Sequence, residues 1–134
     1  MSNVVHLLSA GAAQGLVRAL RPAFEAEHAC RLDGRFGAVG AMRQLLLDGT
    51  PCDVLILTAA QLDELQAQGR VRADARVALG HVATGVAVTT GAPRPDVGSP
   101  AALRAALAQA RALYLPDPEK ATAGIHVMKV LREL

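Results

Sequence analysis

The fold is decided by the stretch VVHLLSAGAAQGLVRALRPAFEAE, residues 4–27. Its first five residues form an apolar run of strand length, and Ser9-Ala10-Gly11 then interrupts the run. From Ala12 to Glu27 the apolar residues recur with helical spacing, which predicts an amphipathic helix. A strand, a tight turn and a helix in this order form the first part of a βαβ unit.

The alternation of strand and helix continues along the chain. Residues 30–36 alternate apolar and polar side chains, which predicts a strand with one wet face near a sheet edge. The apolar run 54–57 is typical of a strand that is buried on both faces. Thr58-Ala59-Ala60-Gln61 has the spacing of a capping box and should open a helix. Strands and helices that alternate in this way predict an α/β fold, with a parallel sheet and helices on both of its faces.

The second part of the chain contains patterns of the same kinds. Strand-like runs occur at residues 77–79, 82–88 and 113–115. Ser99-Pro100 predicts a helix start, because serine caps a helix and proline fits its first turn. A last helix is expected to begin at Thr122 or Gly124. The α/β pattern therefore extends over the whole chain.

Composition argues against several classes of partner. The 134 residues suit one typical domain or two small lobes. A net charge of +2, from fourteen basic and twelve acidic residues, is too balanced for a protein that binds nucleic acid or a membrane surface. An aromatic share of 2% provides almost no stacking platforms for unpaired bases. We therefore expect no nucleic-acid partner.

Two compartments remain open from the sequence. No apolar run reaches the roughly 18 residues that a membrane-spanning helix needs. No secretory signal is visible, since the first expected strand begins within a few residues of Met1. The protein is expected to be cytoplasmic if Met1 is its native start, and periplasmic if a signal has been removed.

The two cysteines, Cys30 and Cys52, are expected to remain free thiols. If the first strand is central, the two residues lie two strands apart, a distance of about 9.6 Å. A disulfide requires Cα atoms within roughly 7 Å of each other. Neither cysteine settles the compartment.

No known catalytic or metal-binding motif is visible. The run Gly11-Ala12-Ala13-Gln14-Gly15 is not the dinucleotide fingerprint, and the chain has no Gly-Lys-Ser/Thr loop. The four histidines lack paired ligand spacing, and no serine lies in a nucleophile-elbow context. No two carboxylates are paired for acid–base work. We therefore expect no enzyme activity, no cofactor and no bound metal.

A ligand site is expected where the strands end. In open parallel sheets, ligands bind beyond the carboxyl ends of the strands, where helix N-termini favour anions. The turns at that edge are small and polar or glycine-rich, which suits either close approach of a ligand or ordinary β-to-α turns. A further turn of this kind opens the last helix. The expected ligand-binding residues are Ser9, Gly11, Ala12, Ala38, Val39, Thr58, Thr122, Ala123 and Gly124.

Short segments along the whole chain resemble one protein family in their order and spacing. They are LSAGA (8–12), FE (24–25), FGAVG (36–40), GTPCDV (49–54), LDEL (62–65), GRV (69–71), GAPRPD (91–96), DP (117–118) and TAGIH (122–126). Together they resemble the molybdate-type solute-binding proteins of ABC transporters, and especially a divergent branch of them.

The resemblance implies a two-lobed periplasmic-binding fold of the second type. Residues 1–80 would form most of lobe one, and residues 81–134 would form the hinge strands and part of lobe two. A small anion, either a molybdate-like oxyanion or a carboxylate, would bind between the lobes. Closure would then present the loaded protein to a membrane permease.

The chain differs from the family pattern in two ways. Family members place serines in the first two turns, where this chain has Gly11 and the run 37–40. Family members are also longer, and they return to lobe one beyond the point that corresponds to Leu134. The second half of the fold is therefore expected to be incomplete, which would leave apolar surface on lobe one. Such surface usually becomes an interface, so we predict a homodimer, with exchanged segments as one form of it.

Three functions remain open at this point. The first is the substrate-binding component of an importer for a small anion. The second is a truncated relative that binds no ligand and serves as a structural or interaction module. The third is an effector-sensing domain, because some transcription regulators use the same fold.

Overall fold

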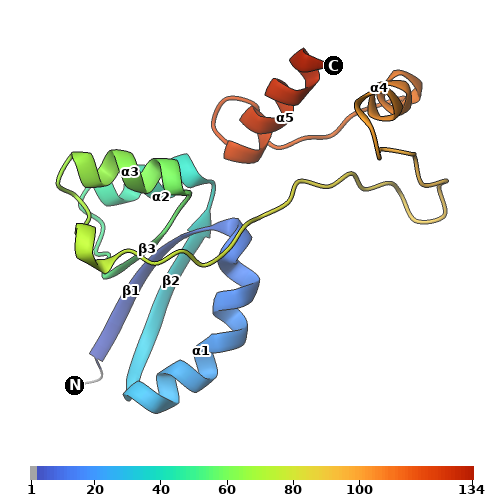
Figure 1. The fold of residues 1–134 in the computed structure, drawn as a ribbon. Coiled ribbons are helices and arrows are strands. Elements are labelled where there is room, and N and C mark those ends of the chain that lie inside the picture. The colour runs from blue at the N-terminus through green and yellow to red at the C-terminus, as the bar shows by residue number, and fades with distance from the viewer. Residues whose placement is uncertain (1–2) are drawn as a thin grey trace. The chain divides into compact units, whose positions relative to one another are not determined.

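The computed structural model describes residues 3–134 (Figure 1). The polypeptide divides into two compact units. The first unit ends at His81 and contains a β-sheet with its helices, whereas the second begins at Val82 and contains two helices.

The sheet of the first unit has three parallel strands. β1 (Asn3–Ala10) lies in the centre, between β2 (Cys30–Gly37) and β3 (Val54–Ile56). The apolar run at residues 4–8 occupies the central strand, which pairs with β2 along its whole length and with β3 at Leu7–Ser9. The predicted α/β fold with a parallel sheet is confirmed.

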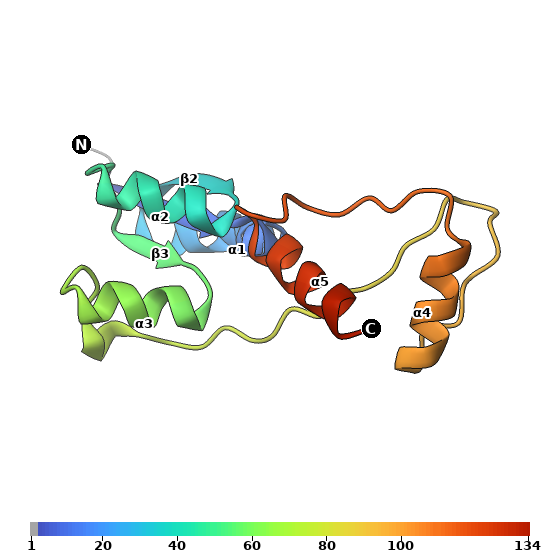
Figure 2. The same ribbon diagram turned by 90° about the horizontal axis from the view of Figure 1, so that it is seen from above.

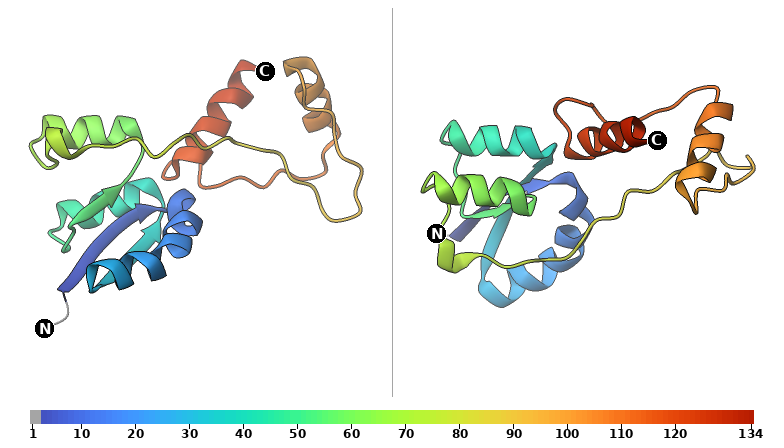
Figure 3. Two further views of the ribbon diagram at one scale, coloured as in Figure 1. Left: turned by 60° about the horizontal axis from the view of Figure 1, so that its bottom comes forward. Right: turned by 45° about the horizontal axis from the view of Figure 1, so that its top comes forward.

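Helices cover both faces of this sheet. Figures 2 and 3 show α1 on one face and the pair α2 and α3 on the other. Right-handed crossovers in a sheet of this strand order produce the same arrangement. An ion pair between Arg43 and Glu64, with 3.7 Å between Nη2 and Oε2, connects α2 to α3. The helical elements of the first unit are η1 (Gly11–Ala13), α1 (Gln14–His28), α2 (Val39–Leu47), α3 (Ala59–Ala67) and η2 (Ala73–Ala75).

The hydrophobic core lies where the sheet meets these helices, and it is small. Leu8 is 1% exposed and Leu65 is fully buried, whereas Leu16 and Leu20 of α1 are about half exposed, at 48% and 58%. The alternation in β2 confirms one wet face, since Leu32 is buried and the next residue, Asp33, is exposed. The buried apolar residues are Leu7, Leu8, Leu32, Met42 and Leu65.

The second unit contains α4 (Pro100–Gln109) and α5 (Thr122–Glu133). The predicted Ser-Pro start of α4 is confirmed, because the Ser99 hydroxyl accepts a hydrogen bond of 3.1 Å from the Ala102 amide. Of the helices in residues 3–134, none has the length and apolar character needed to cross a bilayer.

Several predicted strands do not form. Residues 77–79, 82–88 and 113–115 have no strand assignment and make no ladder with another part of residues 3–134. The prediction was wrong because a strand needs a neighbour for its backbone groups, and strand-like composition does not supply one. The run 54–57 was expected to be buried on both faces. Instead β3 is an edge strand in which Val54 is 44% exposed.

The expectation of free thiols is confirmed for both cysteines. Cys30 begins β2 and Cys52 precedes β3, so the two residues lie on opposite sides of the central strand. The strand order therefore keeps them apart, as the spacing argument predicted.

Candidate functional site

The three strands end at one edge of the sheet, which we call the carboxyl edge. Ala10 at the end of β1 lies opposite Gly37 at the end of β2, and Ser9 lies opposite Ile56 at the end of β3. Because the strands are parallel, η1, α2 and α3 all begin at this edge. The structure thereby brings together five of the predicted ligand-binding residues: Gly11, Ala12, Ala38, Val39 and Thr58.

The helices that begin at this edge have no side-chain caps. Ala10 and Ala13 precede η1 and α1, Ala38 precedes α2 and Thr58 precedes α3, and none of these side chains accepts a hydrogen bond from its helix. The first helical bond of α2 runs from the Met42 amide to the Ala38 carbonyl at 3.1 Å. In each helix, the amides that come before this first helical bond therefore have no intrahelical acceptor. They can donate to a ligand.

The predicted capping box at the start of α3 does not form. The Gln61 side chain donates to Glu64 Oε2 at 3.4 Å instead of turning back to the cap. The Thr58 hydroxyl makes no bond to the helix either. Both the hydroxyl and the first amides of α3 consequently remain available at the carboxyl edge.

The electrostatics of the carboxyl edge favour an anion. The first turns of α1, α2 and α3 contain no aspartate or glutamate. The partial positive charge at a helix start is therefore not neutralised from within the helix. Uncapped amides and unopposed dipoles together form an anion-binding arrangement.

Ser9 does not contribute to this arrangement. Its side chain is fully buried, and its hydroxyl donates to the Ala10 carbonyl at 2.9 Å. A residue in the central strand points to one face of the sheet or the other, and Ser9 points into the covered interior. Gly11, Ala12 and Ala38, by contrast, are exposed.

Thr122, Ala123 and Gly124 lie in the second unit, at the start of α5. Ala121 precedes the helix and provides no side-chain cap, and Thr122 and Ala123 are exposed. Gly124 is buried, and a side chain there would collide with the main-chain carbonyl of Asp117. Its small size is therefore needed for packing of the turn.

That turn is held by the Asp117 carboxylate. Its Oδ1 accepts hydrogen bonds from the amides of Glu119 at 2.8 Å and Lys120 at 2.9 Å. These amides, first that of Glu119, hold the pKa of the Asp117 carboxyl below its usual value. The carboxylate stays ionised and keeps the entry to α5 in place.

Reasoning from the sequence missed several donors at the carboxyl edge. The amides of the first turns of α2 and α3 also lack helical acceptors. Their signal was present in the expected helix starts, because the first three residues of any helix have unpaired amides. The missed donors are Gly40, Ala41, Ala59, Ala60 and Gln61.

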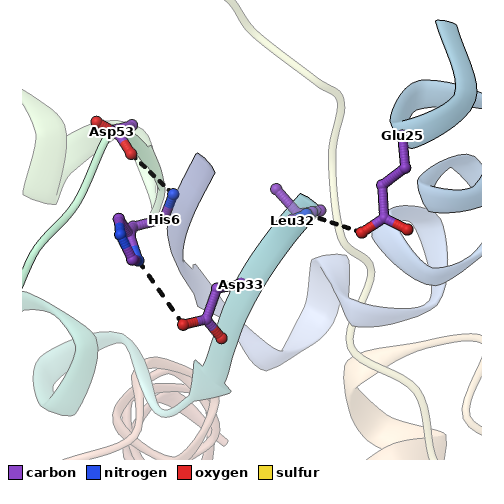
Figure 4. Close-up of polar contacts among 5 residues, drawn as sticks. All are labelled: His6, Glu25, Leu32, Asp33 and Asp53. Atoms are coloured by element: carbon purple, nitrogen blue, oxygen red, sulfur yellow. Dashed lines mark hydrogen bonds and ion pairs between the residues drawn. The ribbon is translucent and has the colours of Figure 1, made fainter. Parts of the chain in front are cut away.

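A second polar group lies in the middle of the sheet, away from the carboxyl edge (Figure 4). His6 Nδ1 is 3.7 Å from Asp33 Oδ2, and the His6 amide donates to Asp53 Oδ2 at 2.8 Å. The adjoining cavity measures about 100 Å³ and is also lined by Arg35 and Thr50. The cavity is small, and the Asp33 carboxylate stands beside its single guanidinium, that of Arg35. It is therefore a poorer anion site than the carboxyl edge.

The chain is similar to an aconitate isomerase from Pseudomonas sp. The two sequences are 31% identical over 130 residues, which cover 93% of this chain and 48% of the relative. The chain therefore spans about half the length of this relative.

This similarity overturns the expectation that the chain has no connection with enzyme activity, since the relative is named as an isomerase. The expectation rested on missing nucleophile, metal and paired-carboxylate patterns. Isomerisation can proceed with one proton-transferring side chain, and a single residue leaves no spacing pattern in a sequence.

A family model for bacterial extracellular solute-binding proteins matches residues 5–134, which is nearly the whole chain. The match agrees with the parallel sheet, the helices on both faces and the helix starts gathered at one edge. The chain belongs to the bacterial extracellular solute-binding protein family.

Proposed function

We propose that this chain binds a small carboxylate at the carboxyl edge of its first unit. The observation that carries the proposal is the set of uncapped helix starts at that edge, with no acidic residue in the first turns of α1, α2 and α3. Backbone amides that face solvent in this way hold carboxylates and other anions by charge-assisted hydrogen bonds.

A polycarboxylate suits this edge better than a single compact ion. Neighbouring strands lie about 4.8 Å apart, so the three strand ends span about 9.6 Å. Aconitate is an unsaturated six-carbon tricarboxylate, whose carboxylates could contact more than one helix start. The 31% identity to an aconitate isomerase supports this class of ligand for the chain.

The chain would form part of an isomerase for such a ligand. The donors at the carboxyl edge are amides and the Thr58 hydroxyl, which position a carboxylate but do not transfer a proton at neutral pH. A proton-transferring group must join them for the double bond to shift or rotate. The proposed role of the described edge is therefore to bind and orient the substrate.

The family match favours a second candidate function, the substrate-binding component of an importer. In that role, residues 1–80 would act as lobe one and residues 81–134 as the hinge and part of lobe two. The ligand would be a carboxylate or a molybdate-like oxyanion, and a membrane permease would receive it. We also propose a homodimer, which is compatible with either function.

Titration with matched ligands tests the proposal. The panel contains cis-aconitate, trans-aconitate and the saturated analogue propane-1,2,3-tricarboxylate, with molybdate, sulfate and phosphate at equal ionic strength. A ligand present at 100 times its Kd adds about 2.7 kcal/mol of stability, which raises Tm by several degrees. Turnover is followed by the vinyl proton resonance, which differs between the two aconitate isomers.

The outcomes separate the candidates. A Tm increase with tricarboxylates but not with oxyanions supports the proposed ligand class, and interconversion of the isomers adds the catalytic role. Binding without interconversion agrees with either role, because the donors at the carboxyl edge do not transfer a proton. Selective binding of molybdate would refute the carboxylate proposal, as would a folded chain whose Tm responds to none of the ligands.

A further inference from the structure

Arg43 in α2 has a guanidinium group that its neighbours satisfy poorly. Its Nε is buried and has no hydrogen-bond partner in residues 3–134. Its Nη2 is 3.7 Å from Glu64 Oε2, which is beyond hydrogen-bond distance. A buried donor without a partner costs free energy of folding. The contacts within the described chain therefore hold this guanidinium only weakly.

Other arginines of the first unit are held by short hydrogen bonds. Arg21 Nε donates to Glu25 Oε1 at 2.9 Å. Arg72 donates to both oxygens of Asp74, from Nε at 3.1 Å and from Nη2 at 2.7 Å. The long contact of Arg43 is therefore unlike these two arginine–carboxylate pairs.

The Arg43 side chain extends toward the carboxyl edge. A helical side chain leans toward the helix N-terminus and covers the turn before its own Cα. For Arg43 this turn is residues 39–42, because α2 begins at Val39. The amides at the start of that turn are donors without helical acceptors. Arg43 thus brings a positive charge to the place where those donors lie.

The same guanidinium lies next to the first turn of α3. The Gln61 side chain, in that turn, donates to Glu64 Oε2 at 3.4 Å, and Arg43 Nη2 approaches the same oxygen. Both helices lie on one face of the sheet, as Figures 2 and 3 show. The Arg43 side chain is 27% exposed, so a ligand at the two helix starts can reach it.

A guanidinium in this place suits a carboxylate. Its planar fork offers two parallel donors to the two oxygens of a carboxylate, a geometry that lysine does not supply. Glu64 is the competing acceptor, and its carboxylate is 54% exposed and can be hydrated when the guanidinium turns away. A ligand carboxylate would therefore give Arg43 stronger bonds than it has in the ligand-free chain.

We propose that Arg43 binds one carboxylate of the ligand and sets a preference for tricarboxylates over dicarboxylates. The inference rests on the proposed function, because it adds a side-chain donor to the same edge. The amides of α2 and α3 hold carboxylates at the strand ends, and the guanidinium takes a further one beside these helix starts. A ligand that lacks this carboxylate leaves Arg43 with its present weak contacts.

Isothermal titration of Arg43→Met tests the inference with trans-aconitate and three dicarboxylates. Itaconate, mesaconate and cis-glutaconate each correspond to trans-aconitate with a different carboxylate replaced by hydrogen. Loss of a hydrogen bond between charged groups should raise the Kd of trans-aconitate about tenfold or more. The dicarboxylate that lacks the carboxylate bound by Arg43 should bind equally to the wild-type chain and to the variant.

Two further variants and a stability measurement accompany this titration. Arg72→Met removes the same charge from a residue that is 79% exposed and precedes η2, outside the carboxyl edge, so the Kd of trans-aconitate should not change. Arg43→Lys keeps the charge without the fork and should recover only part of the affinity. Without ligand, Arg43→Met should have a Tm equal to or above that of the wild-type chain, because it removes a buried donor that lacks a partner.

The outcomes separate this inference from the proposed function. If the wild-type chain binds trans-aconitate and folded Arg43→Met binds it as tightly, the inference is overturned and the proposed function stands. A lower Tm with an equal loss of affinity for all four ligands would also overturn it, since Arg43 would then act only through the structure. A wild-type chain that binds none of the four ligands would overturn the proposed function, and the inference with it.

Discussion

Replacement of Val39 by proline should remove one ligand donor from the carboxyl edge without damage to α2. Val39 is the first residue of the helix, where an amide has no helical acceptor and proline is well tolerated. Ala38 before it has φ −61° and ψ 143°, a conformation that suits the residue before a proline. Stability should therefore stay unchanged or rise by about 0.4–1 kcal/mol.

The loss should appear in ligand affinity. A hydrogen bond to a charged group contributes about 1.5–3 kcal/mol, so loss of this donor should raise Kd about 10- to 150-fold. Ala59→Pro makes the same change at the first residue of α3, where Thr58 has φ −68° and ψ 153°. The two variants therefore remove the same kind of backbone donor from two independent helix starts.

Isothermal titration with trans-aconitate measures the effect, and thermal unfolding shows whether each variant is folded. The matched control is Ala73→Pro at the first residue of η2, after Arg72 with φ −70° and ψ 132°. This turn follows α3 and lies outside the carboxyl edge, so Kd should not change. If Val39→Pro and Ala59→Pro are both folded and bind as tightly as the wild-type chain, the ligand does not use the carboxyl edge.

Three further predictions concern stability. Leu8→Ala removes a side chain that is 1% exposed and should lower the free energy of unfolding, measured in urea, by about 2–5 kcal/mol. Leu16→Ala, at a position that is 48% exposed, should lower it by about 1 kcal/mol. Equal losses for the two variants would contradict the assigned core. The Leu32 amide, and then Arg21, lower the pKa of Glu25 in the folded chain, so its contribution is present at neutral pH and is lost as pH falls through that lowered pKa. The Tm difference between the wild-type chain and Glu25→Gln should therefore shrink in acid, and a constant difference would argue against the assignment. Gly124→Ala should disturb the start of α5 and reduce the helical circular dichroism signal. The reason is that a Cβ there would clash with main-chain carbonyls, which cannot move away as a flexible side chain could. An unchanged spectrum would show that the turn can move.

The elements that form by local rules were predictable from the residues. Periodicity identified β1, β2 and β3 and the helices of both units, and Ser99 was recognised as the cap of α4 because a hydroxyl three residues before an amide forms a local bond. The carboxyl edge followed from the same information, since parallel strands gather their following turns on one side. The free cysteines followed from the strand order.

The predictions that were wrong share a physical cause. Each concerned a feature that depends on a partner distant in sequence or on a choice between competing hydrogen bonds. Residues 82–88 read as a strand, but a ladder needs a neighbour that the pattern cannot supply. Gln61 had the spacing for a capping box, yet its side chain turned to Glu64. The similarity to an isomerase was not expected, because a single acid–base group leaves no periodic trace in a sequence.

The sequence by itself determined the class of fold, the order of its elements and the edge at which anion-binding amides gather, because these follow from local propensity and from the geometry of parallel strands. Only the tertiary structure decided which donors are free, that Ser9 is buried beneath the sheet surface, and that the Glu25 carboxylate binds the Leu32 amide at the β2 edge of the sheet. Those outcomes depend on which groups meet across the fold. Tertiary contacts, and not the identity of any single residue, decide which side chains are buried and which hydrogen bonds form.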